Sequence, residues 1–201
     1  MHVPSDILVT GFGSFPGVET NPTESIIDDL RKTDSQHATR HTTLPVSFER
    51  VFVELTAKVE TYSPTKLLHL GVSGEAREIR IETRAHNHVA AMIPDIDGRQ
   101  PRNNRINRDH PRDHTLAGSP TADAIIAALG AKGLPAAKST DAGRYVCNAL
   151  FYISLHHYGS EREVTFIHIP SLGTPGPTVH TDMVWSTQTL QEAMSIIVES
   201  I

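Results

Sequence analysis

Short apolar runs recur along the chain, and most are followed by a segment whose apolar residues repeat with the period of a helix. The first run, Ile7 to Thr10, ends at a glycine-rich segment and predicts a buried strand that feeds a loop over residues 11–20. A helix is predicted directly afterwards, because Asn21 can cap it, Pro22 suits its first position, and Glu24 lies three residues after the cap. The pattern therefore opens with a strand, a loop and a helix.

The same alternation continues to the end of the chain. Further strands are predicted at Thr42 to Val46, Lys66 to Val72, Glu78 to Ala85, Ala136 to Thr140 and Val164 to Pro170. Further helices are predicted at Phe48 to Tyr62, from Ser119 to Gly130 or Gly133, from Asp141 onward and from Thr181 onward. Alternating strands and helices indicate an α/β fold, in which helices cover both faces of a sheet and ligands bind beyond the carboxyl ends of its strands. We therefore expect the loop over 11–20 to line a site.

Residues 94–119 break the pattern, because they contain three prolines and two glycines and have no apolar period. Loops of this length inside a domain are usually functional or mobile. Arginines stand at positions 99, 102, 105, 108 and 112, interleaved with aspartates. This mixture of charges favours a solvated loop over an anion-binding site.

Composition narrows the classes of protein that the chain can belong to. A chain of 201 residues with 38% hydrophobic and 20% charged residues is expected to form one globular domain over residues 1–201. The net charge of -5 argues against a nucleic-acid partner. No apolar run approaches the roughly 18–20 residues that a membrane span needs, and the first residues lack the pattern of a signal peptide. We expect a soluble cytoplasmic protein without a membrane partner.

The chain has one cysteine, which excludes an intrachain disulfide and a cysteine-based metal site. Cys147 is expected in the first or second turn of its helix, where the helix dipole favours a thiolate. A buried apolar cysteine is the alternative. A nucleophilic thiol also needs a base and a group that orients the base. His168, near the carboxyl end of a strand, and Glu82, on the polar face of another, fit these roles, but a structural histidine and a glutamate paired with an arginine fit the spacing equally well.

Four separated segments resemble those of pyroglutamyl peptidase type I, also called pyrrolidone-carboxylate peptidase, a family of cysteine peptidases. The segments are Leu8 to Phe15 with Asn21-Pro22, His69 to Gly74 with Ile81-Glu82 and His86-Asn87, Asp141 to Asn148, and Phe166 to Pro170. They follow one another in the family's order, and the resemblance spans about residues 7 to 171. The octapeptide around Cys147 is its most specific part.

The resemblance implies a three-layer α/β/α sandwich with a twisted, mostly parallel central sheet. It implies Cys147 as the nucleophile, His168 as general base and then acid, and Glu82 as the group that orients the imidazole. The implied reaction is hydrolysis of the amide bond after an N-terminal pyroglutamyl (5-oxoproline) residue of a peptide, through a thioester and without a metal or cofactor. The implied substrate-binding residues are Phe12, Phe15, Asn21, Tyr145 and Val146. A homo-oligomer, commonly a tetramer, is also implied.

Some of these positions have a second interpretation. Phe12 and Phe15 also fit as core residues beneath their loop, and Asn21 also fits as a helix cap. Met92 stands where some members of the family carry an arginine. The site in this chain is therefore expected without the electrostatic help of that arginine.

Three other functions compete with a cysteine peptidase. A non-catalytic protein that binds the pyroglutamyl lactam would use the same fold and pocket. A histidine-based metal hydrolase would use His86 with His88, His110 with His114, or His156-His157, although none of these pairs has a recognisable third ligand. A dinucleotide-binding module is suggested by Gly11-x-Gly13 after a strand, but the third glycine of that motif is missing.

Overall fold

The computed structural model describes residues 7–15, 17–33, 39–177 and 183–201, and its centre is a six-stranded sheet. The strand order is β2-β1-β3-β8-β4-β7. The strands are β1 (Ile7–Phe12), β2 (Thr39–Leu44), β3 (Lys66–Ser73), β4 (Ile79–Glu82), β7 (Ala136–Ser139) and β8 (Glu163–Pro170). All neighbouring strands are parallel except β4 and β8, which are antiparallel. The prediction of a mostly parallel sheet is confirmed.

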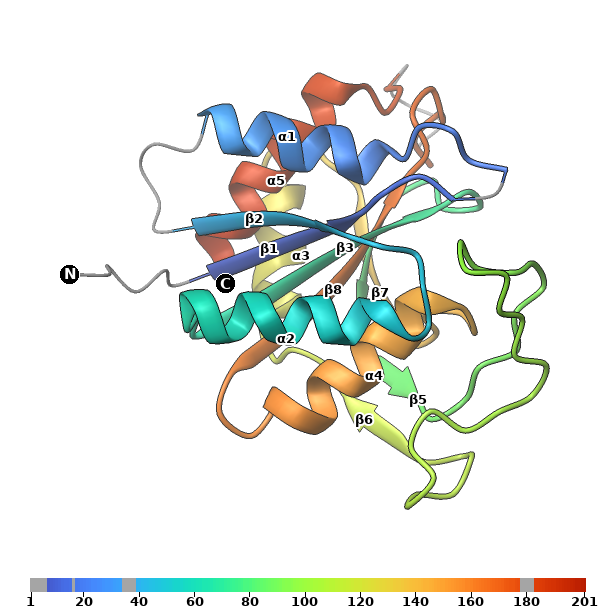
Figure 1. Ribbon diagram of the computed structural model, residues 1–201. Helices are drawn as coiled ribbons and strands as arrows, with labels where there is room; N and C mark the ends of the chain where they lie inside the picture. Colours follow the sequence, from blue (N-terminus) through green and yellow to red (C-terminus); the bar gives the residue numbers. More distant parts are fainter. Residues whose placement is uncertain (1–6, 16, 34–38, 178–182) are drawn as a thin grey trace.

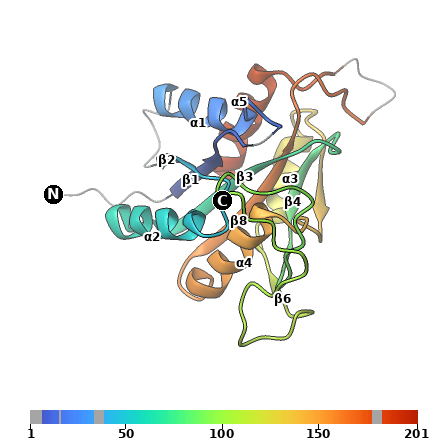
Figure 2. The same cartoon turned by 45° about the vertical axis from the view of Figure 1, so that its right-hand side comes forward.

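Helices cover both faces of this sheet, so the molecule has three layers (Figure 1). The helices of one face are α1 (Pro22–Thr33), α3 (Ala122–Gly130) and α5 (Thr187–Ser200), and those of the other are α2 (Arg50–Tyr62) and α4 (Val146–Tyr158). Figure 2 shows the same layers with α1 and α5 on one side of the strands and α2 and α4 on the other. The predicted α/β/α arrangement is confirmed.

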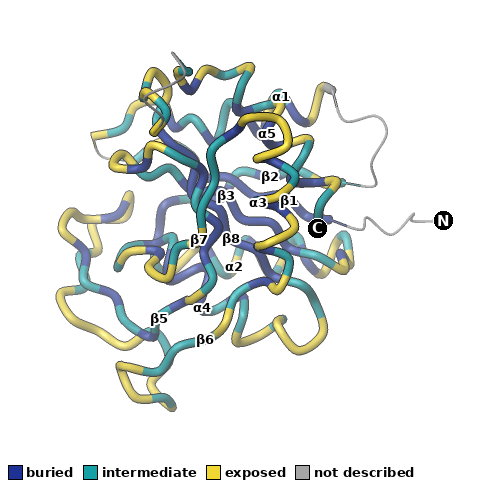
Figure 3. The backbone as a smooth tube through the Cα atoms, turned by 180° about the vertical axis from the view of Figure 1, so that it is seen from behind, coloured by how far each residue is buried: buried dark blue, intermediate teal, exposed yellow. Residues whose placement is uncertain are grey.

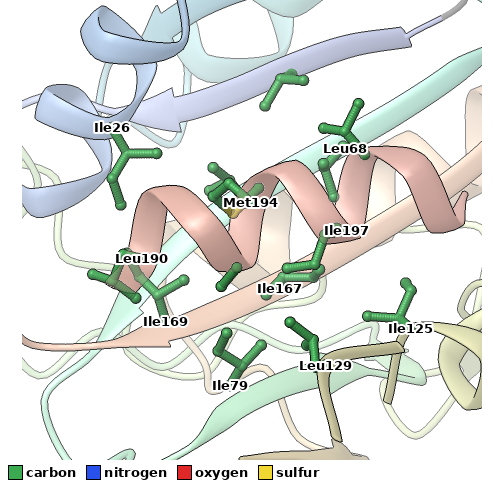
Figure 4. Packing of buried hydrophobic residues seen from close by; sticks show 14 of the residues in the cluster. Ile26, Leu68, Ile79, Ile125, Leu129, Ile167, Ile169, Leu190, Met194 and Ile197 are labelled. Atoms are coloured by element: carbon green, nitrogen blue, oxygen red, sulfur yellow. The ribbon is translucent and has the colours of Figure 1, made fainter. Parts of the chain in front are cut away.

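The face beneath α1, α3 and α5 is an apolar core. Figure 4 shows α5 lying over the sheet, with Leu190 near Ile169 and Ile197 near Ile167 of β8, and Met194 belongs to the same cluster. These five side chains are fully buried. Burial of each such side chain contributes about 1.5–3 kcal/mol to the hydrophobic free energy of folding, so this face carries much of the stability of the fold.

The opposite face combines apolar packing with buried polar groups. His69 of β3 is fully buried, and its two ring nitrogens contact Thr10 Oγ1 at 2.8 Å and Ser154 Oγ at 3.1 Å. Burial lowers the pKa of His69 to about 3, so the ring is neutral. This neutral histidine joins β1, β3 and α4 through hydrogen bonds.

Several predicted boundaries are wrong. The strand predicted over 78–85 ends at Glu82, and a separate strand β5 (Arg84–His86) pairs with β6 (Thr115–Ala117) in a second, two-stranded sheet. The end of the segment predicted as a loop is therefore a strand, because its partner lies far away in the sequence and no local period marks it. At the other end of the chain, α5 begins at Thr187, and the predicted start at Thr181 lies outside the described residues.

The segment 94–114 has an exposed surface but buried polar anchors (Figure 3). The buried Asn87 donates from Nδ2 to the carbonyl oxygens of Asn107, His110 and Pro111, and accepts from the Asn107 N–H. The buried carboxylate of Asp95 accepts hydrogen bonds from three backbone N–H groups, those of Phe48, Asp97 and Arg99. The arginines at 99, 102, 105, 108 and 112 are all exposed, as expected for a solvated loop.

In the part of the chain that the structure describes, no helix has the length and apolarity needed to cross a lipid bilayer.

Candidate active site

Cys147 is the second residue of α4, and the preceding segment turns the chain into that helix. Gly143 has a φ of 79°, a conformation that glycine adopts without steric cost, and Tyr145 is extended. The Asp141 side chain accepts a hydrogen bond from the Gly143 N–H at 3.0 Å. The prediction that the helix starts at Asp141 is wrong for this reason, but Cys147 does lie in the first turn as predicted.

Asn148, beside Cys147, anchors the start of the helix. Its side chain is fully buried, accepts a hydrogen bond from the His86 N–H at 2.9 Å, and donates to the His86 and His88 carbonyl oxygens at 2.9 and 3.0 Å. These bonds hold α4 against residues 86–88. Asn148 was not among the predicted site residues, although its place in the cysteine motif and its polar character inside an apolar helix were signals in the sequence.

His168 and Glu82 meet on the same face of the sheet. The imidazole Nδ1 lies 2.8 Å from Glu82 Oε1, and the side chains are 9% and 1% exposed. The second carboxylate oxygen, Glu82 Oε2, is buried without a hydrogen-bond partner among the described residues. His168 is therefore the group that compensates the charge of this buried carboxylate.

Cys147 Sγ and His168 Nε2 approach each other over Gly71 of β3. A Cβ atom built on Gly71 would lie 3.0 Å from His168 Nε2 and 3.1 Å from Cys147 Sγ, so only glycine fits between the strand and the two side chains. A glycine within an apolar strand is a known sign of close approach, but the sequence did not say what approaches it. The structure thus brings the three predicted catalytic residues into one cluster.

The cluster favours a charged imidazole. Burial lowers the pKa of His168, but hydrogen bonds and charge interactions with Cys147 and Glu82 raise it to about 9. His168 is therefore protonated at neutral pH, with an anionic partner at Nδ1 and the cysteine at Nε2. This arrangement suits a thiolate and imidazolium pair of the kind that cysteine nucleophiles use.

The cluster opens into a cavity of about 540 Å³. The residues that line it are Phe12, Phe15, Asn21, Val46, Val72, Ser73, Glu75, Arg80, Ser139, Thr140, Asp141, Ala142, Gly143, Tyr145, Val146, Cys147 and His168. All eight predicted site residues except Glu82, which lies behind His168, contribute to this lining. The expectation that the loop over 11–20 lines a site agrees with the cavity.

One half of the cavity is aromatic and uncharged. Phe15 and Tyr145 lie with ring centroids 6.3 Å apart, and the Tyr145 hydroxyl donates to the Pro94 carbonyl oxygen at 2.9 Å. Phe12 is 2% exposed, so it both lines the cavity and packs into the core, and Val146 is fully buried beside it. This half can hold a flat, uncharged ring.

Asn21 has the cap role that the sequence allowed. Its Oδ1 accepts from the Thr23 N–H at 3.1 Å, and its Nδ2 donates to the Gly13 carbonyl oxygen at 3.0 Å. Asn21 thereby ties the first loop to the start of α1 while it lines the cavity.

The histidine pairs of the metal alternative lie elsewhere. His110 stacks on His114 with ring centroids 4.2 Å apart, and His156 contacts His110 edge to face at 5.5 Å. Across the described ranges, no group of three or more histidine, cysteine, aspartate or glutamate side chains has a geometry that could hold a metal. Met92 is 90% exposed and does not line the cavity.

Gly11 serves packing instead of phosphate binding. A Cβ atom there would lie 2.8 Å from Ile27 Cγ1 and 2.9 Å from the Thr23 carbonyl oxygen, so the glycine lets α1 pack closely on β1. The helix begins only at Pro22, after a long loop.

Comparisons with known proteins agree with this geometry. The family model described as pyroglutamyl peptidase matches residues 5–200. A pyrrolidone-carboxylate peptidase of Brevibacillus brevis is 33% identical over 201 residues, covering 96% of this chain and 91% of that protein. A solved structure of the pyrrolidone carboxyl peptidase from Thermococcus litoralis superposes with a TM-score of 0.85 at 29% identity, over 96% of this chain and 91% of that one. The chain belongs to the pyroglutamyl peptidase family.

Proposed function

We propose that this protein is a cysteine exopeptidase that hydrolyses the amide bond after an N-terminal pyroglutamyl residue of a peptide. The observation that carries the proposal is the cluster of Cys147, His168 and Glu82, which opens directly into a cavity with an uncharged aromatic half. The family to which the chain belongs supports the same substrate class.

In the first step, the Cys147 thiolate attacks the carbonyl carbon that follows the lactam ring. The carbonyl oxygen becomes an oxyanion, and backbone N–H groups in the first turn of α4 can stabilise it, because such groups have no acceptor within the helix and Tyr145 supplies no side-chain cap. The protonated His168 gives its Nε2 proton to the leaving amine. The C–N bond breaks, and a thioester remains on Cys147.

In the second step, water hydrolyses the thioester. His168, now neutral, takes a proton from the attacking water at Nε2, while Glu82 stabilises the imidazolium that forms. Collapse of the tetrahedral intermediate expels the Cys147 thiolate and releases pyroglutamate. The thiolate and imidazolium pair is then restored.

The aromatic half of the cavity binds the lactam ring. Phe12, Phe15 and Tyr145 offer flat apolar surface, and Val146 completes it. Asn21 donates one amide hydrogen to the Gly13 carbonyl oxygen, and its second amide hydrogen can be donated to the lactam carbonyl oxygen. No carboxylate or ammonium lies among these five residues, which suits an uncharged ring better than a free N-terminal amine.

A fluorogenic pyroglutamyl amide tests the proposal. Wild-type protein should release the amine, and Cys147→Ala should lose this activity while still binding pyroglutamate, as followed by calorimetry. Equal release by Cys147→Ala would refute the nucleophile. Binding without turnover by the wild type would favour the non-catalytic lactam-binding alternative, and loss of activity with EDTA but not with iodoacetamide would favour the histidine-based metal hydrolase.

We also propose that residues 1–201 act as one catalytic domain, as a homo-oligomer, in the cytoplasm. The family match over 5–200 supports a single unit, and the resemblance supports a tetramer. A free catalytic thiol suits a reducing compartment. Analytical ultracentrifugation would measure the oligomeric state, and cell fractionation would measure the location.

A further inference from the structure

Arg80 lies in the same cavity as the nucleophile, although neither step of the proposed reaction needs it. It belongs to β4, and its backbone pairs with His168 in the antiparallel register of β4 and β8. Alternate residues of a strand share a face, so the Arg80 side chain lies on the same side of the sheet as Glu82, which bonds His168. Arg80 therefore stands beside the general acid, on the side of the catalytic face.

The strand order shows on which side of the cavity Arg80 lies relative to the aromatic half. Across the order β1-β3-β8-β4, the cavity residues are Phe12 on β1, His168 on β8 and Arg80 on β4, and the close approach over Gly71 lies on β3. When the lactam ring occupies the aromatic half near β1 and the scissile carbonyl lies at Cys147, the leaving amine points past His168 toward β4. Arg80 is then on the leaving-group side.

The Arg80 side chain is half-buried, and its positive charge is not compensated by another described residue. Within the described ranges it has neither an ion-pair partner nor a hydrogen-bond partner. The carboxylate nearest in the sequence on the same face, Glu82, is bonded to His168. A guanidinium has five donors arranged to bind a carboxylate in two places, and its exposure to the cavity leaves it open for a ligand.

Besides the catalytic cluster, two other charged side chains line the cavity. Asp141 is exposed and forms an ion pair with Arg144, so its charge is compensated. Glu75 is exposed at the rim, whereas Arg80 is partly buried. Because a charge in a less solvated position interacts more strongly, Arg80 dominates the interior of the leaving-group half.

We propose that Arg80 is a specificity residue that binds a carboxylate on the amino acid released from pyroglutamate, an inference that rests on the proposed function. Two kinds of substrate carry such a carboxylate: a pyroglutamyl dipeptide, whose α-carboxylate is two bonds from the scissile nitrogen, and a longer peptide with Asp or Glu after the lactam. Facing side chains in an antiparallel pair have Cβ atoms about 5 Å apart, so a carboxylate this close to the scissile bond is within reach of an arginine on β4.

The test compares pairs of substrates that differ only in this charge. The first pair is pyroglutamyl-alanine and pyroglutamyl-alaninamide, and the second is pyroglutamyl-glutamate amide and pyroglutamyl-glutamine amide. We expect the wild type to have a kcat/KM about three- to tenfold higher for the charged member of at least one pair. The pair that responds identifies the source of the carboxylate.

Arg80→Gln should bring that ratio close to one, because only the charged member loses a contact, and any general effect on catalysis changes both members alike and cancels in the ratio. Arg80→Lys should keep part of the preference, because it retains the charge but not the two-point geometry. The groups that set the pKa of His168 are Cys147 and Glu82, so the alkaline limb of the pH profile should stay in place in Arg80→Gln. If Arg80 had only a structural role, its substitution would lower kcat/KM for both members of a pair by the same factor and would leave their ratio unchanged.

Arg77→Gln is the matched control, since it removes the same charge from an exposed residue three positions earlier that does not line the cavity. It should leave the ratio unchanged. The proposal for Arg80 is overturned if the ratio is unchanged in Arg80→Gln, or if the wild type prefers the charged member of neither pair. Cleavage of the neutral amides would still support the proposed function in either case. If the wild type cleaves none of the four substrates, the proposed function itself fails.

Discussion

The two faces of the central sheet have different compositions and different tasks. The face beneath α1, α3 and α5 buries aliphatic side chains almost throughout, and its one unpartnered polar atom among the described residues is Thr165 Oγ1. The face beneath α2 and α4 buries His69, Glu82 and His168 among its apolar residues. The first face contributes hydrophobic free energy to folding. The second face holds polar side chains in fixed positions, buried away from water.

Two histidines on the polar face show how partners control charge. His69 and His168 are both buried and both have a hydrogen-bond partner at Nδ1. The hydrogen-bond partners of the His69 ring are two hydroxyl groups, and burial lowers the pKa of His69 to about 3. His168 is subject to the same effect of burial, but Cys147 and Glu82 raise its pKa to about 9. Burial alone makes a neutral histidine, and an adjacent carboxylate and thiol make a charged one.

The largest expected effect comes from removing the charge on Glu82. Glu82→Gln keeps the size of the side chain but no longer compensates the imidazolium, and its amide can donate to Nδ1 and hold the wrong tautomer. We expect kcat/KM to fall about 1,000-fold. The pKa of His168 should fall as well, as measured by NMR titration of the ring.

A stable Glu82→Gln protein with wild-type kinetics would remove Glu82 from the mechanism. Its folding should be checked first by circular dichroism. Because the variant removes one partner of a buried charge pair, we expect thermal stability to fall as well, so kinetics are compared at a temperature where both proteins are folded.

The next largest effect is expected at Gly71, where the polar face has no room for a methyl group. Gly71→Ala would force Cys147 Sγ and His168 Nε2 apart, because the added carbon would lie about 3 Å from each. A displacement of about 1 Å can cost about 100-fold in rate, and we expect a loss of kcat of this size.

Gly74→Ala is the control for this substitution. A Cβ atom there meets nothing within 4 Å, and Gly74 has no positive φ. Full activity in Gly71→Ala would contradict the close approach of the two side chains, whereas an equal loss in both variants would point to a general effect on β3.

The pH dependence should separate the two histidines. On the proposed mechanism His168 donates the proton to the leaving amine, so kcat/KM should fall about tenfold per pH unit above a pKa of about 9. The folded state favours the charged form of His168, so its contribution to the free energy of unfolding is complete below pH 6.5 and is lost as the pH rises through about 9. His69 has the opposite sign: its contribution is present above pH 6.5 and is lost as the pH falls toward about 3.

Rate profiles and urea unfolding between pH 4 and 10 would measure these effects. His69→Gln should remove most of the acid-side decrease in stability and leave the alkaline limb of the rate profile in place. An alkaline limb near pH 6.5 would mean that the partners of His168 do not raise its pKa.

The smallest effect is expected on the apolar face. Thr165→Val replaces a buried hydroxyl that has no partner among the described residues with a methyl group of similar size. We expect the free energy of unfolding to rise by about 1 kcal/mol, measured by urea denaturation, with unchanged kcat and KM. Destabilisation, or altered kinetics, would show that the two faces are not as separate as the structure implies.

Much of the fold could be predicted because it depends on local periods. The runs at Ile7 to Thr10, Lys66 to Val72 and Val164 to Pro170 became strands of the sheet, and the amphipathic segment after Asn21 became α1. The pairing of β5 with β6 could not be predicted, since a strand of three residues has no period and its partner is distant. The start of α4 was misplaced because the turn around Gly143 precedes the helix.

The candidate site divides in the same way. Cys147 and His168 could be singled out by residue type and by their places on a helix and a strand. The resemblance to a family assigned roles to both residues. No local pattern indicated that their side chains meet over Gly71 of β3 or that Asn148 anchors α4. Arg80 was one charge among many until the sheet order brought it beside His168.

The sequence by itself determined which groups are available: one thiol, a histidine at the end of an apolar strand, a glutamate on a polar face, and the periods that make strands and helices. Only the tertiary structure decided that Glu82 and His168, 86 positions apart, share a hydrogen bond and that Cys147 meets them. The physical reason is that periodicity depends on neighbours along the chain, whereas pKa, burial and reach depend on neighbours in space. Those neighbours exist only once the strands have taken their order in the sheet.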